Sequence, residues 1–169
     1  MALVIHNAGS LGKVGQTASE MDDVAEWQRY LDLNLSSTIL LNTLFLQKFP
    51  KSSGVNVSVV NITSLCAVQP FRSMGYYCVG KAAREMFFKV LADEEPWLDV
   101  LNYSPGPVET DMTDIIVANV KDDAIRQSFN DMRKNKTIVT VEQTTAKFLE
   151  VIGAKKYKSG GRVDYFDEL

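Results

Sequence analysis

Apolar positions along the chain alternate between short continuous runs and helix-like spacing. Apolar, β-branched runs at 3–5, 55–62 and 98–103 each end in polar or Gly- and Pro-containing segments. Such runs predict buried β-strands. A shorter strand is predicted over 162–166, directly after a pair of glycines.

Between these strands, four segments carry apolar side chains three and four residues apart: 24–49, 77–95, 111–136 and 142–152. This spacing predicts helices, with breaks in the third and most polar segment. The second half of the first helix is apolar on almost every side, so we expect it to be buried on more than one side.

The order of these elements predicts an α/β fold in which parallel strands are joined by crossover connections. No internal repeat, low-complexity tract or long linker divides the chain, so residues 1–169 are expected to form a single domain. A parallel sheet rarely begins with a strand at residue 3. We therefore expect that part of the sheet lies upstream of this sequence.

Composition and charge exclude several classes of protein. The chain has 169 residues, of which 46% are hydrophobic and 23% charged, and its net charge is −3. This composition predicts a folded chain, and the lack of a long basic run argues against nucleic-acid and anionic-membrane partners. No apolar run is long enough to span a membrane, and no secretory signal is apparent. A cytoplasmic location is expected.

Cysteine and histidine positions give no sign of a metal site. Cys66, Cys78 and His6 do not have the spacing of metal ligands, and two cysteines are too few for a disulfide framework. Both cysteines are therefore expected to be reduced thiols. His6 is expected to be a loop residue that hydrogen-bonds the backbone.

The strongest chemical signal is Tyr77 followed four residues later by Lys81, with Ser64 at the end of a predicted strand. Residues four apart share a helix face, and a nearby cation lowers a tyrosine pKa from its reference value of about 10. Ser64 could hydrogen-bond the same substrate oxygen, so the group suits proton delivery to a carbonyl. The alternative is an exposed helix pair contributing about 0.2–0.5 kcal/mol.

Further polar motifs surround this group in a fixed order. Asn7-Ala8-Gly9 follows the first strand, Asn34 lies in the long helix, and Pro105-Gly106 with Thr110 follows the third strand. Together with the serine, tyrosine and lysine, this order resembles the short-chain dehydrogenase/reductase family. The resemblance implies a Rossmann-type doubly wound parallel sheet, of which this chain would hold only the C-terminal portion, about four strands with flanking helices.

The resemblance also implies catalytic roles for four residues. Tyr77 would donate the proton, and Ser64 would hold the carbonyl oxygen. Lys81 would lower the pKa of Tyr77 and bind the nicotinamide ribose. Asn34 would distort its helix locally to hold a relay water.

The implied cofactor is NADP, bound as NADPH. Besides Lys81, the resemblance places at this cofactor a loop beside the adenosine ribose and a second loop beside the nicotinamide carboxamide. These loops comprise Asn7, Ala8, Gly9, Val108, Glu109, Thr110, Asp111, Met112 and Thr113. The Gly-rich pyrophosphate loop of the family is not found, because the run 9–15 does not fit its pattern. The chain alone is therefore expected to bind NADPH weakly or not at all.

Within the family, the segments 61–71, 77–84, 101–107 and 158–167 resemble members that reduce a pterin side-chain ketone in tetrahydrobiopterin biosynthesis. The resemblance implies that the substrate is bound by Ser64, Leu65, Tyr77, Gly106 and Asp164. The Asp164 carboxylate would accept two parallel N–H bonds from the guanidine-like edge of the pterin. Its alternative role is that of a solvated acid at a strand end.

Two other functions remain open at this stage. The chain could be a catalytically silent fragment that acts as a dimerisation or regulatory partner, since family members commonly form homodimers by packing the helices that correspond to 24–49 and 77–95. It could also be a carbonyl reductase with non-pterin substrates. Half of a doubly wound sheet is expected to expose an unpaired edge and an apolar helix face.

Overall fold

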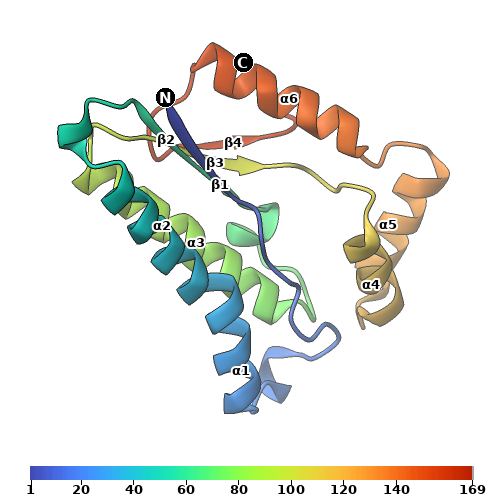
Figure 1. Ribbon diagram of the computed structural model, residues 1–169. Helices are drawn as coiled ribbons and strands as arrows, with labels where there is room; N and C mark the ends of the chain where they lie inside the picture. Colours follow the sequence, from blue (N-terminus) through green and yellow to red (C-terminus); the bar gives the residue numbers. More distant parts are fainter. Residues whose placement is uncertain (169) are drawn as a thin grey trace.

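The computed structural model describes residues 1–168, which fold around a sheet of four parallel strands. The strands are β1 (Ala2–His6), β2 (Val57–Ile62), β3 (Asp99–Ser104) and β4 (Arg162–Asp164), arranged in the order β1-β2-β3-β4. The predicted α/β class is confirmed, and all four predicted strands are present (Figure 1).

Two helices cover one face of the sheet, and a third precedes one of them and lies beyond the strand ends (Figure 1). α1 (Val24–Leu31) and α2 (Ser37–Lys48) are joined through a π-helical turn over Asp32–Ser36, and α3 (Gly75–Glu94) lies beside them (Figure 1). The predicted helix over 24–49 is thus confirmed in extent, but it contains a wider turn that hydrophobic spacing did not predict.

The remaining helices follow β3. α4 (Asp111–Asn119) and α5 (Asp123–Lys134) extend beyond the strand ends, whereas α6 (Val141–Ala154) covers the sheet face opposite α3 (Figure 1). The predicted breaks within 111–136 are confirmed by the separation of α4 from α5. Short 3₁₀ turns complete the chain at Ala18–Glu20, Lys51–Ser53 and Leu65–Ala67.

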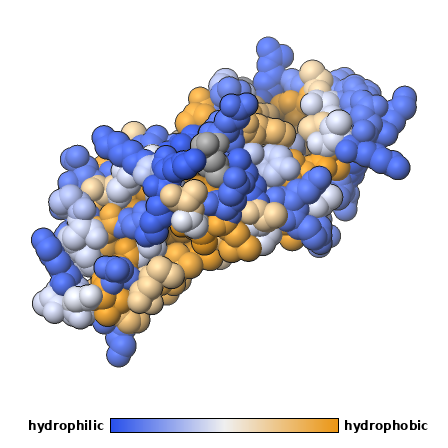
Figure 2. Space-filling model, turned by 90° about the horizontal axis from the view of Figure 1, so that it is seen from above, coloured by the Kyte–Doolittle hydropathy of each residue, from blue (hydrophilic) through white to orange (hydrophobic). Residues whose placement is uncertain are grey.

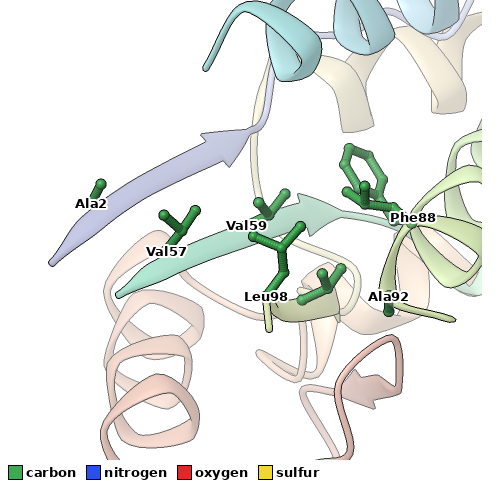
Figure 3. Packing of buried hydrophobic residues seen from close by; sticks show 8 residues of the cluster. Ala2, Val57, Val59, Phe88, Ala92 and Leu98 are labelled. Carbon is green, nitrogen blue, oxygen red and sulfur yellow. The ribbon is translucent and has the colours of Figure 1, made fainter. Parts of the chain in front are cut away.

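Apolar side chains fill both faces of the sheet. Between β2, β3 and α3, Val59, Val100 and Phe88 are completely buried (Figure 3). On the opposite face, Leu101 packs with Val151 of α6. The parallel register places the carboxyl ends of the strands at one edge of the sheet. The two central strands are buried on both faces, as is usual for strands of a parallel sheet.

The predicted burial of the first long helix is wrong. Leu40, Leu41 and Leu44 of α2 have 64%, 55% and 62% of their surface exposed. The helix contacts the sheet along one side only, and no other element within residues 1–168 covers these leucines. Figure 2 likewise shows apolar side chains gathered on the surface of the molecule, along the middle of the face in view.

The edge of the sheet is also open. Within residues 1–168, β1 pairs with β2 alone, and its Leu3 and Ile5 side chains are 38% and 44% exposed. This arrangement agrees with the expected unpaired edge. No helix in the described part of the chain is long and apolar enough to cross a membrane.

The sequence predicts that His6 lies in a loop, but it is the last residue of β1. Its ring is buried, contacts Asn42 Oδ1 through Nε2 at 3.2 Å and packs on Phe88 with 5.2 Å between ring centroids. Burial lowers the pKa of His6. The strand continues to this residue because β2 offers it a parallel partner, Asn61.

Candidate active site at the carboxyl ends of the strands

Ser64 lies just beyond the carboxyl end of β2. It is the N-cap of the 3₁₀ turn Leu65–Ala67, and its Oγ accepts a hydrogen bond from the Cys66 amide at 3.2 Å. A serine at this position satisfies a backbone donor of the turn. The hydroxyl is therefore held at the strand end.

Tyr77 and Lys81 lie on successive turns at the start of α3. Lys81 Nζ is 5.5 Å from the centroid of the Tyr77 ring and donates to the Ile62 carbonyl at 2.7 Å. The lysine is buried, with 8% of its surface exposed. The alternative of an exposed helix pair is therefore wrong, because the ammonium is anchored to the end of β2.

The pKa values of this pair depart from the sequence prediction. Burial raises the pKa of Tyr77 to about 12, although a hydrogen bond with Ser64 acts in the opposite direction. Burial, followed by the charge of Arg84, lowers the pKa of Lys81 to about 7. The predicted lowering of the Tyr77 pKa is wrong for this structure, because burial disfavours the charged phenolate and raises the pKa.

Asn34 lies in the middle of the π-helical turn and is buried. Its Nδ2 donates to the Tyr30 carbonyl at 2.9 Å and to Ser10 Oγ at 3.2 Å, while its Oδ1 accepts from the Ser10 amide at 2.7 Å. The implied local distortion of the helix is present. The side chain fixes the loop after β1, and its relay-water role stays a prediction.

The sequence reasoning missed Arg84, which joins this loop to α3. Its guanidinium is almost completely buried and donates to the His6 carbonyl at 2.6 Å, the Ala8 carbonyl at 2.8 Å and Asn61 Oδ1 at 3.1 Å. A side chain at Gly9 would begin 3.0 Å from Asn34 Oδ1. The Asn7-Ala8-Gly9 loop is therefore held against Asn34 and Arg84.

A second arginine that the sequence reasoning missed, Arg162, links Ser64 to Asp164. Arg162 Nη1 donates to Glu85 Oε2 at 2.8 Å and to the Ser64 carbonyl at 3.0 Å, while its Nη2 donates to Asp164 Oδ2 at 3.1 Å. Thr63 Oγ1 also donates to the buried Glu85 carboxylate, at 2.7 Å. The candidate substrate acid is thus an ordered part of this network rather than a free strand-end acid.

Only part of the loop expected beside the nicotinamide packs near Tyr77. Met112 and Tyr77 pack against the same apolar cluster, whereas the Glu109 carboxylate pairs with Arg133 Nη2 at 2.6 Å. The Thr113 hydroxyl donates to the Val108 carbonyl at 2.7 Å. Glu109 is therefore bound to α5 instead of facing Tyr77. The remaining members of this loop, Thr110 and Asp111, are at the start of α4.

The two other candidate substrate residues are Leu65, in the 3₁₀ turn after Ser64, and Gly106, just beyond β3. Leu65 is 41% exposed. Gly106 has a φ of 75°, and a side chain there would approach Val139 and Tyr165. Two shallow surface hollows are lined by residues of α6 and of the segment 156–168, and neither is lined by Ser64, Tyr77 or Lys81.

A parallel α/β sheet with this serine, tyrosine and lysine at its carboxyl edge can be compared with known families. Residues 1–121 match the family model described as short chain dehydrogenase. The chain belongs to the short-chain dehydrogenase family. Sepiapterin reductase from Bos taurus is 42% identical over 166 residues, which cover 98% of this chain and 62% of the bovine protein. Sepiapterin reductase from Xenopus tropicalis is 40% identical over 165 residues. The chain thus spans less than two thirds of the length of these relatives.

A more distant relative acts on another substrate. Benzil reductase from Bacillus subtilis is 35% identical over 124 residues, which cover 71% of this chain and 50% of that protein. Among solved structures, the KRED1-Pglu enzyme has a TM-score of 0.82 at 28% identity, over 96% of this chain and 68% of that one. The described residues therefore match part of the Rossmann fold of this family.

Members of this family typically use a nicotinamide cofactor, and the residues expected at its two ribose groups have side chains and backbone that fit one. Lys81 donates to the Ile62 carbonyl, but an ammonium has three donors and could hold a ribose hydroxyl as well. The glycine at position 9 keeps the loop after β1 free of a side chain beside Asn34. These features suit close approach of a dinucleotide to the backbone.

Proposed function

We propose that this chain is the catalytic and substrate-binding portion of an NADPH-dependent carbonyl reductase of the sepiapterin reductase type. The observation that carries the proposal is that Tyr77 of α3 is hydrogen-bonded to Ser64 at the end of β2. The buried Lys81 lies beside the Tyr77 ring and donates to the Ile62 carbonyl. The 42% identity to the bovine enzyme supports a pterin substrate.

In this mechanism, bound NADPH supplies the hydride, and the side chains of the chain handle the proton. Tyr77, with a pKa of about 12, keeps its proton at neutral pH and can donate it to the oxygen of the reduced carbonyl. The Ser64 hydroxyl donates a hydrogen bond to the same oxygen. The Lys81 ammonium then stabilises the phenolate that Tyr77 becomes.

Asp164 is the proposed anchor for the pterin ring. Arg162 donates to Oδ2 of its carboxylate, and a carboxylate has about four acceptor positions, so further N–H groups can bind. Because Arg162 also donates to the Ser64 carbonyl, the carbonyl-binding and ring-binding ends of the proposed site share one guanidinium.

Replacement of Tyr77 by Phe tests the proposed chemistry. Removal of a general acid is expected to lower turnover of sepiapterin about 10²–10⁴-fold, measured by the loss of NADPH absorbance at millimolar cofactor. Tyr157→Phe is a matched control, because Tyr157 interacts with Asp99 away from the serine turn, and its turnover should equal that of the wild type. A fully active Tyr77→Phe variant, or an inactive wild-type chain that is shown to bind NADPH under the assay conditions, would contradict the proposal.

The choice between pterin and non-pterin substrates is tested at Asp164. Asp164→Ala should weaken sepiapterin reduction much more than reduction of a small dicarbonyl, which has no guanidine-like edge to bind. The ratio of the two rates within one protein sample is the control for folding. Equal losses would instead favour a general carbonyl reductase, the function that the relationship to benzil reductase supports.

A second candidate function is that of a catalytically silent homodimerisation partner. The exposed leucines of α2 favour it, together with Met86 and Val90 of α3, which are 59% and 45% exposed. Apolar surface of this kind commonly marks an interface. A defined dimer that neither binds NADPH nor reduces sepiapterin would support this function over the first.

A further inference from the structure

The two cysteines of the chain lie on the two segments that carry the candidate catalytic hydroxyls. Cys66 is in the 3₁₀ turn two residues after Ser64 and is 8% exposed, whereas Cys78 follows Tyr77 in α3 and is partly exposed. Cys66 belongs to an apolar cluster against which Cys78 packs, and both thiols are free. The turn packs on α3 and so brings the two cysteines, twelve positions apart in sequence, to the same apolar cluster.

The surroundings of the two sulfur atoms differ. A hydrogen bond with Cys66, together with a backbone hydrogen bond from Phe71, lowers the pKa of the Cys78 thiol. The same contact between the thiols, together with burial, raises the pKa of Cys66. Cys78 lies near the N-terminus of a long helix, where a thiolate is favoured. The pair therefore consists of a partly exposed thiol near a helix N-terminus and a buried thiol in the turn after Ser64.

We propose that Cys78 and Cys66 form a peroxide-reactive dithiol, in which Cys78 is oxidised by a hydroperoxide and Cys66 converts the product to an intrachain disulfide. Accessible thiols of this kind that stand next to a second, resolving cysteine are typical of redox-sensitive sites. The inference does not depend on the proposed reductase activity.

The chemistry balances in two steps. The Cys78 thiolate attacks one oxygen of the hydroperoxide, the O–O bond breaks, and the leaving oxygen takes a proton from water, which leaves Cys78 as a sulfenic acid. The Cys66 sulfur then attacks the Cys78 sulfur, the S–O bond breaks, and the hydroxyl leaves as water with the proton of Cys66. The two thiols lose two electrons, and the hydroperoxide gains them.

The disulfide would tie together both sides of the candidate site. The Cys66 amide donates to Ser64 Oγ, and Cys78 is bonded in sequence to Tyr77. Oxidation at this pair would therefore join the turn that orients the serine to the helix that carries the tyrosine.

The test uses the full chain, treated with hydrogen peroxide at neutral pH and then with a thiol-alkylating reagent. Peptide mapping by mass spectrometry without reductant should find one cross-linked species containing Cys66 and Cys78, which dithiothreitol returns to two free thiols. Two alkylated cysteines after treatment, or disulfides only between separate chains, would overturn the proposal.

Single variants separate the roles of the two sulfurs. Cys66→Ser should accumulate a sulfenic acid at Cys78 that dimedone traps, because the resolving thiol is gone. In Cys78→Ser, Cys66 should oxidise about tenfold or more slowly than Cys78 does in the wild type, as expected for a buried thiol that keeps its proton. Faster oxidation of Cys66 than of Cys78 would overturn the assignment, and the map of the wild type decides the matter if either variant does not fold.

Discussion

Tyr77 and Lys81 are one helical turn apart, yet each responds mainly to its own burial. The phenol stays protonated, with a pKa of about 12, and the lysine pKa falls to about 7. A proton donor that is neutral before the reaction and paired with a cation after it suits carbonyl reduction. The lysine thus acts on the phenolate that forms, more than on the resting phenol.

The lowered pKa of Lys81 predicts a particular pH dependence of stability. Between pH 7 and about 10.4, the unfolded chain binds the Lys81 proton while the native chain releases it, so the free energy of unfolding rises with pH in this window. Urea denaturation across this range should show the wild type gaining stability relative to Lys81→Met. Parallel curves for the two proteins would contradict this prediction.

Arg84 is expected to be a major contributor to stability at the site. Arg84→Gln removes charge-assisted hydrogen bonds to the His6 and Ala8 carbonyls and should cost about 2–4 kcal/mol of unfolding free energy, measured by urea denaturation. Arg72→Gln is the matched control, since the Arg72 side chain is 89% exposed and its ion pair with Asp122 measures 3.8 Å. That variant should change stability by less than about 0.5 kcal/mol.

At the scale of elements, the π-helical turn and α2 have different partners. The turn places Asn34 against the loop after β1. A π-helical turn holds one residue more than an α-helical turn, and in this wider turn the Asn34 side chain accepts a hydrogen bond from the Ser10 amide. After this turn, α2 continues with leucines on its exposed side. The π-helical turn thus makes a polar contact within the chain, whereas the exposed side of α2 is apolar.

The exposed surface of α2 predicts self-association. In sedimentation velocity, the wild type should form a dimer that Leu40→Glu combined with Leu44→Glu converts to a monomer, because charges would be buried in an apolar interface. Leu149→Glu changes a leucine of α6 that is 58% exposed and should leave the dimer intact. A monomeric wild type, or equal dissociation by both changes, would argue against an α2 interface.

At the scale of the whole molecule, the described sheet would form one side of the proposed cofactor site. Its strands align Ser64 at the end of β2 with Gly106 beyond β3 and Asp164 at the end of β4, while β1 is an open edge. Contacts to a dinucleotide would come from the loop after β1, from Lys81 and from the start of α4. The sequence has no Gly-rich motif at which a helix N-terminus could bind the pyrophosphate.

This arrangement predicts weak binding of NADPH by the chain alone. The dissociation constant should be about millimolar or weaker, measured by the change of NADPH fluorescence on titration. NADH should bind equally weakly, because the basic residues to which the resemblance assigns the choice between the two cofactors are not found in this sequence. Micromolar affinity for NADPH, or strong preference over NADH, would show that other residues of this chain hold the phosphates.

Sequence reasoning found the catalytic candidates but not the side chains that hold them. Tyr77 and Lys81 share a helix face through their spacing, and the strand end at Ser64 follows from a continuous apolar run. Arg84 and Arg162 gave no such signal, because their carbonyl partners lie 76, 78 and 98 residues away in sequence. The cofactor and substrate roles were implied by the family resemblance and stay predictions.

The sequence by itself determined the order of strands and helices and the common face of Tyr77 and Lys81. These features depend on periodicity over a few residues, which backbone geometry translates directly into structure. Only the tertiary structure decided which charges are buried, which way the Tyr77 pKa shifts, and which leucines of α2 face solvent. Desolvation and exposure depend on neighbours that are distant in the chain, so no local pattern can specify them.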